Sequence, residues 1–259
     1  MTTTTPAFRI EDLKVKYGSA LALDSINAEI PHGVVTGLVG PNGSGKTTLL
    51  RTMYGALTPA GGRVLLNGSP LDSLDPREIS REISVVVQQS FIPHRMSVLD
   101  EVLLGRMPFI SDFSPYREED RKLALNALEA VGMLDKSERR SDELSGGERQ
   151  RVVIARALAQ GSRCILLDEP TNHLDIRYQH EVLELLRDLG RTVVIVLHDL
   201  NMAARYCDRI HILSAGRMHS VGAAEQVLLE STIAELYGVN VSRIDHCGKP
   251  QFLFTSPTR

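Results

Sequence analysis

Short apolar runs separated by polar turns recur along this 259-residue chain. Residues 8–15 and 26–30 alternate apolar with polar side chains, which predicts strands that bury one face. Four later runs are apolar without alternation and predict fully buried strands, over 34–39, 83–87, 164–167 and 193–197. Because strands buried on both faces are typical of parallel sheets covered by helices, the pattern predicts an α/β fold.

Helical spacing replaces the strand signals between about residues 91 and 150. Ser97 is placed to cap a helix over 98–104, and apolar residues over 117–131 lie three and four positions apart. We therefore expect a small helical subdomain inserted at about 91–150. It would belong to a domain over 8–259 that follows a flexible N-terminus over 1–7.

Local signals predict the remaining elements. Asp75, Pro76 and Glu78 have the spacing of a helix cap, a first-turn proline and a capping box. Asn67 and Gly68 predict a hairpin turn after a strand. The strand before that turn is expected over 61–66. The expected helices cover residues 49–57, a long stretch that follows residue 175 and ends at 186, and a stretch around 224–237. A strand or hairpin is expected over 209–221 and a last strand over 251–254.

Composition argues against several classes of protein. The formal net charge of −3 disfavours a broad nucleic-acid-binding surface. No apolar run approaches the roughly 18 residues that span a bilayer, and the first residues lack the pattern of a secretion signal. The 3 cysteines and 8 histidines are scattered, which predicts neither a disulfide framework nor a metal-ligand cluster. We expect a reduced, cytosolic protein.

A glycine-rich loop follows the apolar run over 34–39 and consists of Gly40, Pro41, Asn42, Gly43, Ser44, Gly45, Lys46, Thr47 and Thr48. Its glycines let backbone N–H groups converge on phosphate oxygens where a Cβ would intrude. Lys46 suits the β- and γ-phosphates, and the Thr47 hydroxyl suits Mg²⁺. The alternative is a chance match in a flexible loop, and the strand before it and the helix after it argue against that. The loop predicts nucleoside triphosphate binding.

Polar residues also follow three other buried strands, namely Gln88, Asp168 with Glu169, and His198. Parallel strands would bring such ends to one edge of a sheet, beside the glycine-rich loop. Asp168 suits a Mg²⁺ shell, and Glu169 suits the polarisation of an attacking water. Each residue alone is also compatible with a surface turn or a local hydrogen bond. Their repetition favours a shared site.

Two further features each have two possible roles when only the residues are considered. Ser145, Gly146 and Gly147 enter an apolar-rich helix, either as a cap without a ligand or as an anion site at the positive end of the helix dipole. Tyr17 lies between the first two strands, either as a packing aromatic or as a platform on which a purine base stacks.

In this order, the motifs resemble those of the ATP-binding subunits of ABC transporters, over about residues 8–254. The glycine-rich loop is similar to the family's first phosphate motif, residues 144–148 to its signature, and residues 164–169 to its second nucleotide motif with the catalytic glutamate. Gln88, residues 172–175 and His198 stand at the positions of the glutamine, aspartate and histidine loops. The resemblance implies a P-loop NTPase core with a mostly parallel sheet, an N-terminal antiparallel β subdomain and a helical subdomain insertion.

The resemblance also implies roles for single residues. Those that would serve hydrolysis are Glu169, His198, Lys46 and Gln88. His198 would also contact the γ-phosphate, and Tyr17 would stack on adenine. The residues that would hold Mg²⁺ are Thr47, Gln88 and Asp168. Those that would contact ATP on a second copy of the chain, in a head-to-tail dimer, are Ser145, Gly146, Gly147 and Asp175.

The signature departs from the commonest family form, which has glutamine where this chain has Glu148. A carboxylate that faced a γ-phosphate directly would be unfavourable. We therefore expect Glu148 to point away from that contact.

A finer resemblance concerns the transported substrate. Residues 105–120, 171–179 and 236–239 are similar to the iron(III)-chelate importer branch. This implies import of iron(III)-siderophore complexes through separate membrane permease subunits, served by an external substrate-binding protein. The chain would lie on the cytoplasmic face of the cell membrane and would bind no nucleic acid. Haem and vitamin B12 importers share much of the pattern and stay alternatives. A non-transport ABC ATPase is disfavoured, since no coiled-coil insertion or second nucleotide domain is visible.

Overall fold

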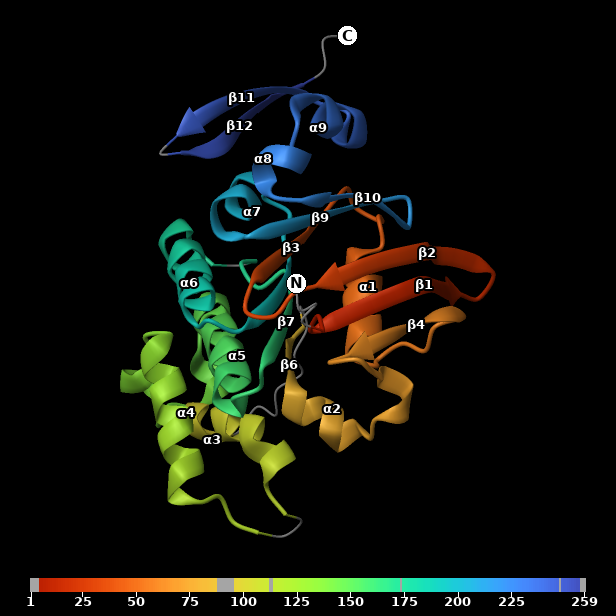
Figure 1. Cartoon of the computed structure of the whole chain (residues 1–259). Helices are drawn as coiled ribbons and strands as arrows, with labels where there is room; N and C mark the ends of the chain where they lie inside the picture. The colour runs from red at the N-terminus through yellow and green to blue at the C-terminus, as the bar shows by residue number, and fades with distance from the viewer. Residues whose placement is uncertain (1–4, 88–95, 112–113, 173, 247, 257–259) are drawn as a thin grey trace. The chain divides into compact units, whose positions relative to one another are not determined.

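The computed structural model describes residues 5–87, 96–111, 114–172, 174–246 and 248–256. The chain forms two compact units, each described here by itself (Figure 1). The first unit joins Met1–Leu74 to Gly190–Arg259, and the second is Asp75–Leu189.

An antiparallel sheet near the N-terminus confirms the alternating strands of the first unit. Its order is β2-β1-β4-β5, from strands β1 (Phe8–Tyr17), β2 (Ala20–Ile30), β4 (Gly61–Leu66) and β5 (Ser69–Pro70). Leu66 pairs with Ser69 across the expected hairpin turn. Asn67 and Gly68 both have positive φ, 52° and 87°, which is the backbone twist that a two-residue hairpin requires.

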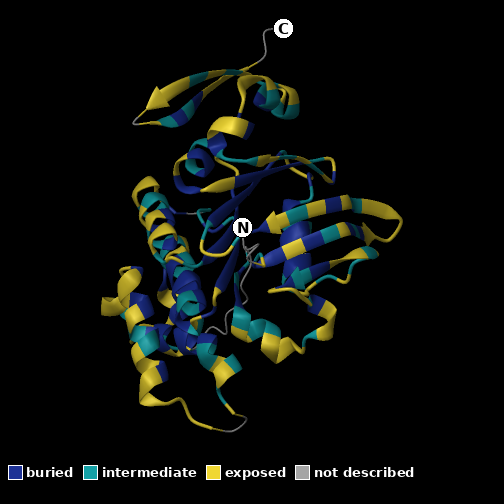
Figure 2. Ribbon diagram, viewed as in Figure 1, coloured by how far each residue is buried: buried dark blue, intermediate teal, exposed yellow. Residues whose placement is uncertain are grey.

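Parallel strands form the second sheet region of this unit. Strand β3 (Val35–Val39) lies between β8 (Thr192–Val196) and β9 (Arg209–Ser214) and is parallel to both. Strand β10 (Arg217–Gly222) returns antiparallel to β9. Every residue of β3 and β8 is buried, as their mostly apolar sequences predict; Figure 2 shows β3 in dark blue.

Helices α1 (Lys46–Met53) and α7 (Leu200–Tyr206) leave the carboxyl ends of β3 and β8. Helix α1 packs against β8 and β2, and α7 packs against β3. The expected helix over 49–57 is therefore displaced, because the glycine-rich loop ends in a helix whose first residue is Lys46.

The tail of the first unit corrects one expectation and adds an element. The helical stretch around 224–237 is two helices, α8 (Ala224–Val227) and α9 (Glu230–Tyr237). The final strand is β12 (Lys249–Thr255), and it pairs with an unexpected strand, β11 (Asn240–His246). Only part of β11 is shielded from solvent, so its sequence carries few apolar residues.

The second unit contains a parallel pair of strands, β6 (Ile83–Val86) and β7 (Cys164–Asp168). Helix α2 (Pro76–Glu82) has the expected cap: the Asp75 carboxylate accepts from two backbone N–H groups, and Glu78 completes the capping box. Helix α5 (Gly146–Gln160) precedes β7, and α6 (Ile176–Asp188) follows it. Among the described residues, short 3₁₀ helices are formed by Leu71–Ser73, Leu104–Phe109, Leu134–Lys136 and Ser141–Glu143.

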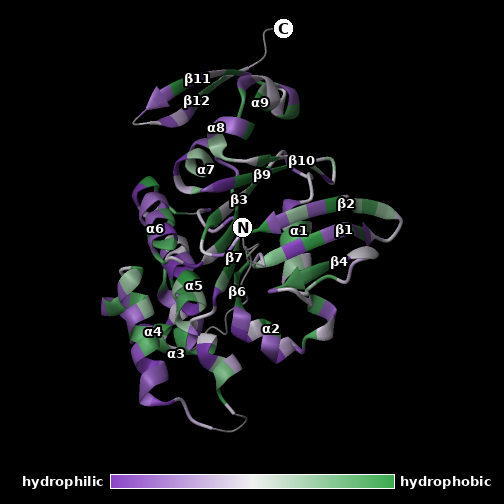
Figure 3. Ribbon diagram, viewed as in Figure 1, coloured by the Kyte–Doolittle hydropathy of each residue, from purple (hydrophilic) through white to green (hydrophobic). Residues whose placement is uncertain are grey.

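Helices α3 (Val98–Leu103) and α4 (Glu118–Ala130) pack against each other and against α5. Ser97 caps α3 as expected, by accepting from the backbone N–H of Asp100 at 3.0 Å. Helix α4 buries Ala124, Ala127 and Leu128, and its other side is hydrophilic (Figure 3). The helical spacing in the sequence therefore reports which side of α4 faces its neighbours.

Strand β9 buries a histidine without a hydrogen-bond partner. His211 has no exposed surface, and neither ring nitrogen meets a partner among the described residues. Burial, with a smaller contribution from the charge of Arg209, lowers the pKa of His211 from 6.5 to about 4. The folded chain therefore keeps this ring neutral at neutral pH.

We expect the free energy of unfolding to fall as the pH drops from about 6.5 to about 4. In that window the unfolded chain binds a proton at His211 and the folded chain does not. At roughly 1.4 kcal/mol per pH unit, the loss is about 3 kcal/mol. Urea unfolding of His211→Leu across this range should show a shallower loss. The matched change at the exposed His219, on the neighbouring strand β10, should keep the wild-type slope. Equal slopes for all three proteins would contradict the assignment.

Candidate nucleotide-binding site

The glycine-rich loop closes on itself between β3 and α1. The Lys46 side chain is buried, and its ammonium donates to the carbonyl oxygens of Gly40 at 2.8 Å and Pro41 at 2.9 Å. Gly216 N–H, from the turn between β9 and β10, donates to Ser44 O at 3.1 Å. The loop is thus a preformed ring of backbone with one cation tied to it.

Two glycines of this loop are required by their surroundings. Gly40 has φ +145°, and a Cβ there would lie 2.1 Å from Leu213 O. Gly45 has φ +101° at the start of α1, and its Cβ would lie 2.6 Å from a methyl carbon of Leu23 on β2. At Gly40 a Cβ would meet backbone, so a side chain there would shift the loop. At Gly45 it would meet the buried Leu23 side chain, and the positive φ adds strain.

Tyr17 lies at the end of β1, where the chain turns into β2. It pairs with Ala20 across the hairpin and is 48% exposed. The same strand β2 reaches the glycine-rich loop, because Ala22 O lies 3.1 Å from the Cβ position of Gly45. The exposed ring therefore belongs to the hairpin that touches the loop, and a packing role inside the core is excluded.

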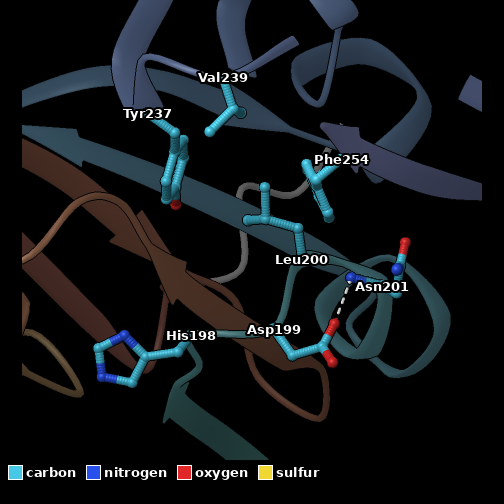
Figure 4. Close-up of a pocket in the computed structure, with 7 residues that line it drawn as sticks. All are labelled: His198, Asp199, Leu200, Asn201, Tyr237, Val239 and Phe254. Carbon is cyan, nitrogen blue, oxygen red and sulfur yellow. Dashed lines mark hydrogen bonds between the residues drawn. The ribbon is translucent and has the colours of Figure 1, made fainter. Parts of the chain in front are cut away.

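The parallel pairing of β3 and β8 brings two of the sequence motifs to one edge. Gly40 follows β3 and His198 lies just beyond β8, and the two strands run side by side from Val35 with Val193 to Leu38 with Val196. His198 is exposed there. The next residue, Asp199, caps α7 by accepting from the N–H groups of Asn201 at 2.7 Å and Met202 at 3.1 Å (Figure 4).

A pocket of about 570 Å³ lies beside this histidine and is largely apolar. Its lining comes from α7 and the residues just before it, from the end of α9 and the residues just after it, and from β12. It comprises His198, Asp199, Leu200, Asn201, Tyr237, Val239 and Phe254 (Figure 4). Asn201 joins the elements: its amide donates to Phe252 O at 3.2 Å and accepts from Phe252 N at 2.7 Å. Burial raises the pKa of Tyr237 to about 12, although a hydrogen bond with the Gly40 backbone lowers it.

These C-terminal contacts have no counterpart among the sequence expectations, which placed no site residue after His198. The tail carries no motif of known chemistry. Tyr237 meets the Gly40 backbone, and Phe252 meets Asn201, only after folding, so the sequence pattern carries no signal for these contacts.

In the second unit, Asp168 and Glu169 end strand β7. Asp168 is 2% exposed. Glu169 has φ 51°, the left-handed region that disfavours a side chain by about 1 kcal/mol. Its carboxylate accepts from the Asn172 amide at 2.6 Å. Strain of this kind at a strand end is often found at functional residues, where it fixes the direction of a side chain.

The signature lies at the start of α5. Ser145 and Gly146 are exposed, and Gly147 is half-buried. A Cβ added to Gly146 would meet nothing within 4 Å. The fold of the chain itself therefore gives no reason for a glycine at this position.

The remaining residues singled out in the sequence are Asp175, Gln88 and Glu148. The Asp175 carboxylate caps α6 by accepting from Tyr178 N at 3.0 Å. Gln88 lies outside the described residues. The Glu148 carboxylate accepts from the hydroxyl and the N–H of Ser145, both at 2.8 Å, because the two residues form a capping box, and its direction relative to a γ-phosphate stays a prediction.

Clusters of metal ligands and membrane-spanning helices are both absent among the described residues. No group of three or more histidine, cysteine, aspartate or glutamate side chains gathers where it could hold a metal ion. None of the described helices is both long enough and apolar enough to cross a membrane.

The loop, the strand ends and the signature define a class of protein. The family model for the ABC transporter matches residues 23–172, which is more than half of the chain. The chain therefore belongs to the ABC transporter family, as an ATP-binding subunit.

Individual relatives narrow this class. The petrobactin import ATP-binding protein of Bacillus anthracis is 39% identical, over 89% of this chain and 86% of the relative. The ferric enterobactin transport ATP-binding protein of Escherichia coli is 38% identical, over 95% and 92%. The hemin import ATP-binding protein of Pseudomonas entomophila is 39% identical, over 90% and 92%.

Solved structures agree with the fold. One is an ABC transporter assigned to the metal-chelate type, in an inward-facing conformation, with a TM-score of 0.83 and 28% identity; it covers 97% of this chain, which covers 98% of it. Another is a dimeric bacterial ABC transporter cassette, with a TM-score of 0.75 and 31% identity, over 84% of this chain and 98% of that one. The fold is that of the ATP-binding cassette, as expected from the motifs.

Proposed function

We propose that this chain binds and hydrolyses ATP in a head-to-tail dimer and thereby powers an importer of iron(III)-siderophore complexes. The observation that carries the proposal is the similarity to two siderophore import ATP-binding proteins at 38–39% identity, over at least 86% of their lengths. The motifs support the proposed hydrolysis of ATP, and the relatives support the proposed substrate class.

The proposed reaction is in-line attack of water on the γ-phosphate. The amides of the glycine-rich loop and Lys46 would hold the phosphates, and Tyr17 would stack on adenine. Glu169 would orient and polarise the water, and His198 would contact the γ-phosphate. The exposure of His198 supports its role, because a ligand can reach the ring. The strained backbone of Glu169 supports its role, because strain of this kind is often found at functional residues.

The donor set fits Mg²⁺ shared with a nucleotide. Mg²⁺ keeps several waters and takes one or two carboxylates together with substrate phosphates, so it needs no cluster of three acidic side chains. The buried Asp168, the Thr47 hydroxyl and the Gln88 amide are the oxygen donors that would hold it. When bound, the ion neutralises charge on the phosphates.

The dimer proposal explains the signature. Ser145 and Gly146 are exposed at the start of α5, and the open space around Gly146 would admit another molecule at close range. In the proposed dimer, Ser145, Gly146, Gly147 and Asp175 complete the site of the second copy. ATP would then join the two copies, and hydrolysis would release them.

The membrane partner is a separate permease with its external substrate-binding protein. We propose that the helical insertion, near residues 88–117, docks the permease on the cytoplasmic face of the membrane. This segment leads from Gln88 into α3, so it would connect the γ-phosphate to the docking surface.

Uptake by a deletion strain tests the substrate class. We expect loss of the gene to reduce the uptake of radiolabelled iron(III)-siderophore at least tenfold, and a plasmid copy of the wild type to restore it. A Glu169→Gln copy should fail to restore it, because the transport would need turnover. Haem and cobalamin uptake are measured in the same strains. Loss of haem or cobalamin uptake with normal siderophore uptake would replace the proposed substrate.

A further inference from the structure

The hydroxyl proton of the signature serine, Ser145, already makes a hydrogen bond within its own chain. Ser145 Oγ donates to Glu148 Oε2 at 2.8 Å and accepts from Glu148 N at 3.3 Å. A serine hydroxyl carries one hydrogen, so it donates to one acceptor at a time. Ionised phosphate oxygens only accept. Ser145 therefore must leave Glu148 before it donates to a γ-phosphate.

Glu148 is held in this position from its other oxygen as well. Lys136 Nζ donates to Glu148 Oε1, and both side chains are only 22–23% exposed. The Lys136 ammonium and the two donors of Ser145 lower the pKa of Glu148 to about 2. The carboxylate is thus ionised at every pH at which ATP binding would be measured, and Lys136 balances its charge.

We propose that Glu148, with its charge balanced by Lys136, is a latch on the signature: its carboxylate retains the Ser145 hydroxyl in the single chain and sets how readily two ATP-loaded copies join. Glu148 is a positioning residue that acts through Ser145. This inference rests on the proposed function, since it assumes that Ser145 meets the ATP of a second copy.

The proposal predicts opposite effects on dimerisation for substitutions of Glu148 and of Lys136. Glutamine at position 148 still accepts from Ser145, but it does so without charge, and hydrogen bonds to charged groups are the stronger ones. It also removes a negative charge from beside the incoming triphosphate. Loss of Lys136 leaves the Glu148 charge unbalanced at the same place, so it should oppose joining.

The test measures ATP-dependent dimerisation of the full chain by light scattering, in a Glu169→Gln parent that retains its ATP. Glu148→Gln should tighten dimerisation about tenfold. Lys136→Met should weaken it by a similar factor, and the double variant should dimerise at least as tightly as the parent. ATP affinity of the single chain should stay unchanged in all of them, because the proposed dimer places the signature on the nucleotide of the second copy.

A neighbouring carboxylate provides the matched control. Asp142 lies in the same segment and pairs with Arg140, but it makes none of the contacts to Ser145 described above. Asp142→Asn removes the same charge and should leave dimerisation unchanged. Melting temperatures of all variants separate the latch from a helix cap, because a purely structural cap predicts weaker dimers and lower melting for Glu148→Gln.

The outcomes separate the two proposals. Tighter dimers in Glu148→Gln, with Asp142→Asn unchanged, support the latch. Unchanged or weaker dimers in Glu148→Gln overturn it while the sandwich stands. A Glu169→Gln parent that binds ATP and stays monomeric overturns the sandwich, and the latch with it.

Discussion

Replacing Glu169 with glutamine should reduce the ATP turnover number about a thousandfold and leave ATP binding within about threefold of the wild type. A positioned general base contributes roughly 10²–10⁴ in rate, and glutamine removes it without changing the size of the side chain. Glutamine also keeps an oxygen that accepts from the Asn172 amide, now at 2.6 Å from the carboxylate. The backbone at φ 51° is unaffected by the change. The loss should therefore appear in the rate and not in affinity.

Phosphate release under saturating ATP measures the rate, and a fluorescent ATP analogue measures the affinity. Glu181→Gln is the control, because Glu181 is an exposed carboxylate on α6 whose pair with Arg177 contributes little at the surface. It should keep wild-type turnover. A Glu169→Gln protein that still hydrolyses ATP within tenfold of the wild type would remove Glu169 from the catalytic role.

Lys46→Met should weaken ATP binding at least a hundredfold. The change keeps most of the aliphatic stem and deletes the ammonium, whose charge-assisted hydrogen bonds to phosphate are stronger than neutral ones. Lys46 is 5% exposed and donates to the carbonyls of Gly40 and Pro41, so its ammonium group already lies within the loop. A buried cation in place before the ligand arrives loses little entropy on binding.

Calorimetric titration with ATP measures this loss, and a melting temperature close to that of the wild type shows that the loop still folds. Lys14→Met is the matched control in the same unit: Lys14 is 41% exposed, and its nearest acid, Asp12, is 3.7 Å away. That variant should bind ATP like the wild type. Equal affinity for Lys46→Met and the wild type would exclude the glycine-rich loop as the phosphate site.

The strands were predictable because their patterns are local. The fully buried strands β3, β7 and β8 consist mostly of apolar residues, and such runs are visible without knowledge of the partner strand. The cap at Asp75 and the turn at Asn67 were predictable for the same reason, since both depend on residues within three positions. Strand β11 was missed because five of its seven residues are exposed, so most of its positions accept polar side chains.

The residues of the candidate site also differ in whether local sequence identifies them. Glycine-rich loops, strand-end carboxylates and the signature are short motifs, so their residues could be named in advance. The pairing of Asn201 with Phe252 joins positions 51 residues apart and depends on how the tail folds back on α7. The retention of Ser145 by Glu148 could have been noticed from the capping-box spacing, but the charge balance comes from Lys136, which lies 12 residues before Glu148.

The sequence by itself determined the class of this protein, because phosphate binding depends on backbone geometry that glycines, a lysine and a threonine impose within nine residues. Only the tertiary structure decided how those groups are held. It showed that Gly40 has no room for a Cβ beside Leu213, and that His211 lies neutral in the core. It also showed that the Ser145 hydroxyl is already bonded. Each of these depends on which distant atoms surround a side chain, and desolvation and hydrogen bonding act only between groups that folding has brought together.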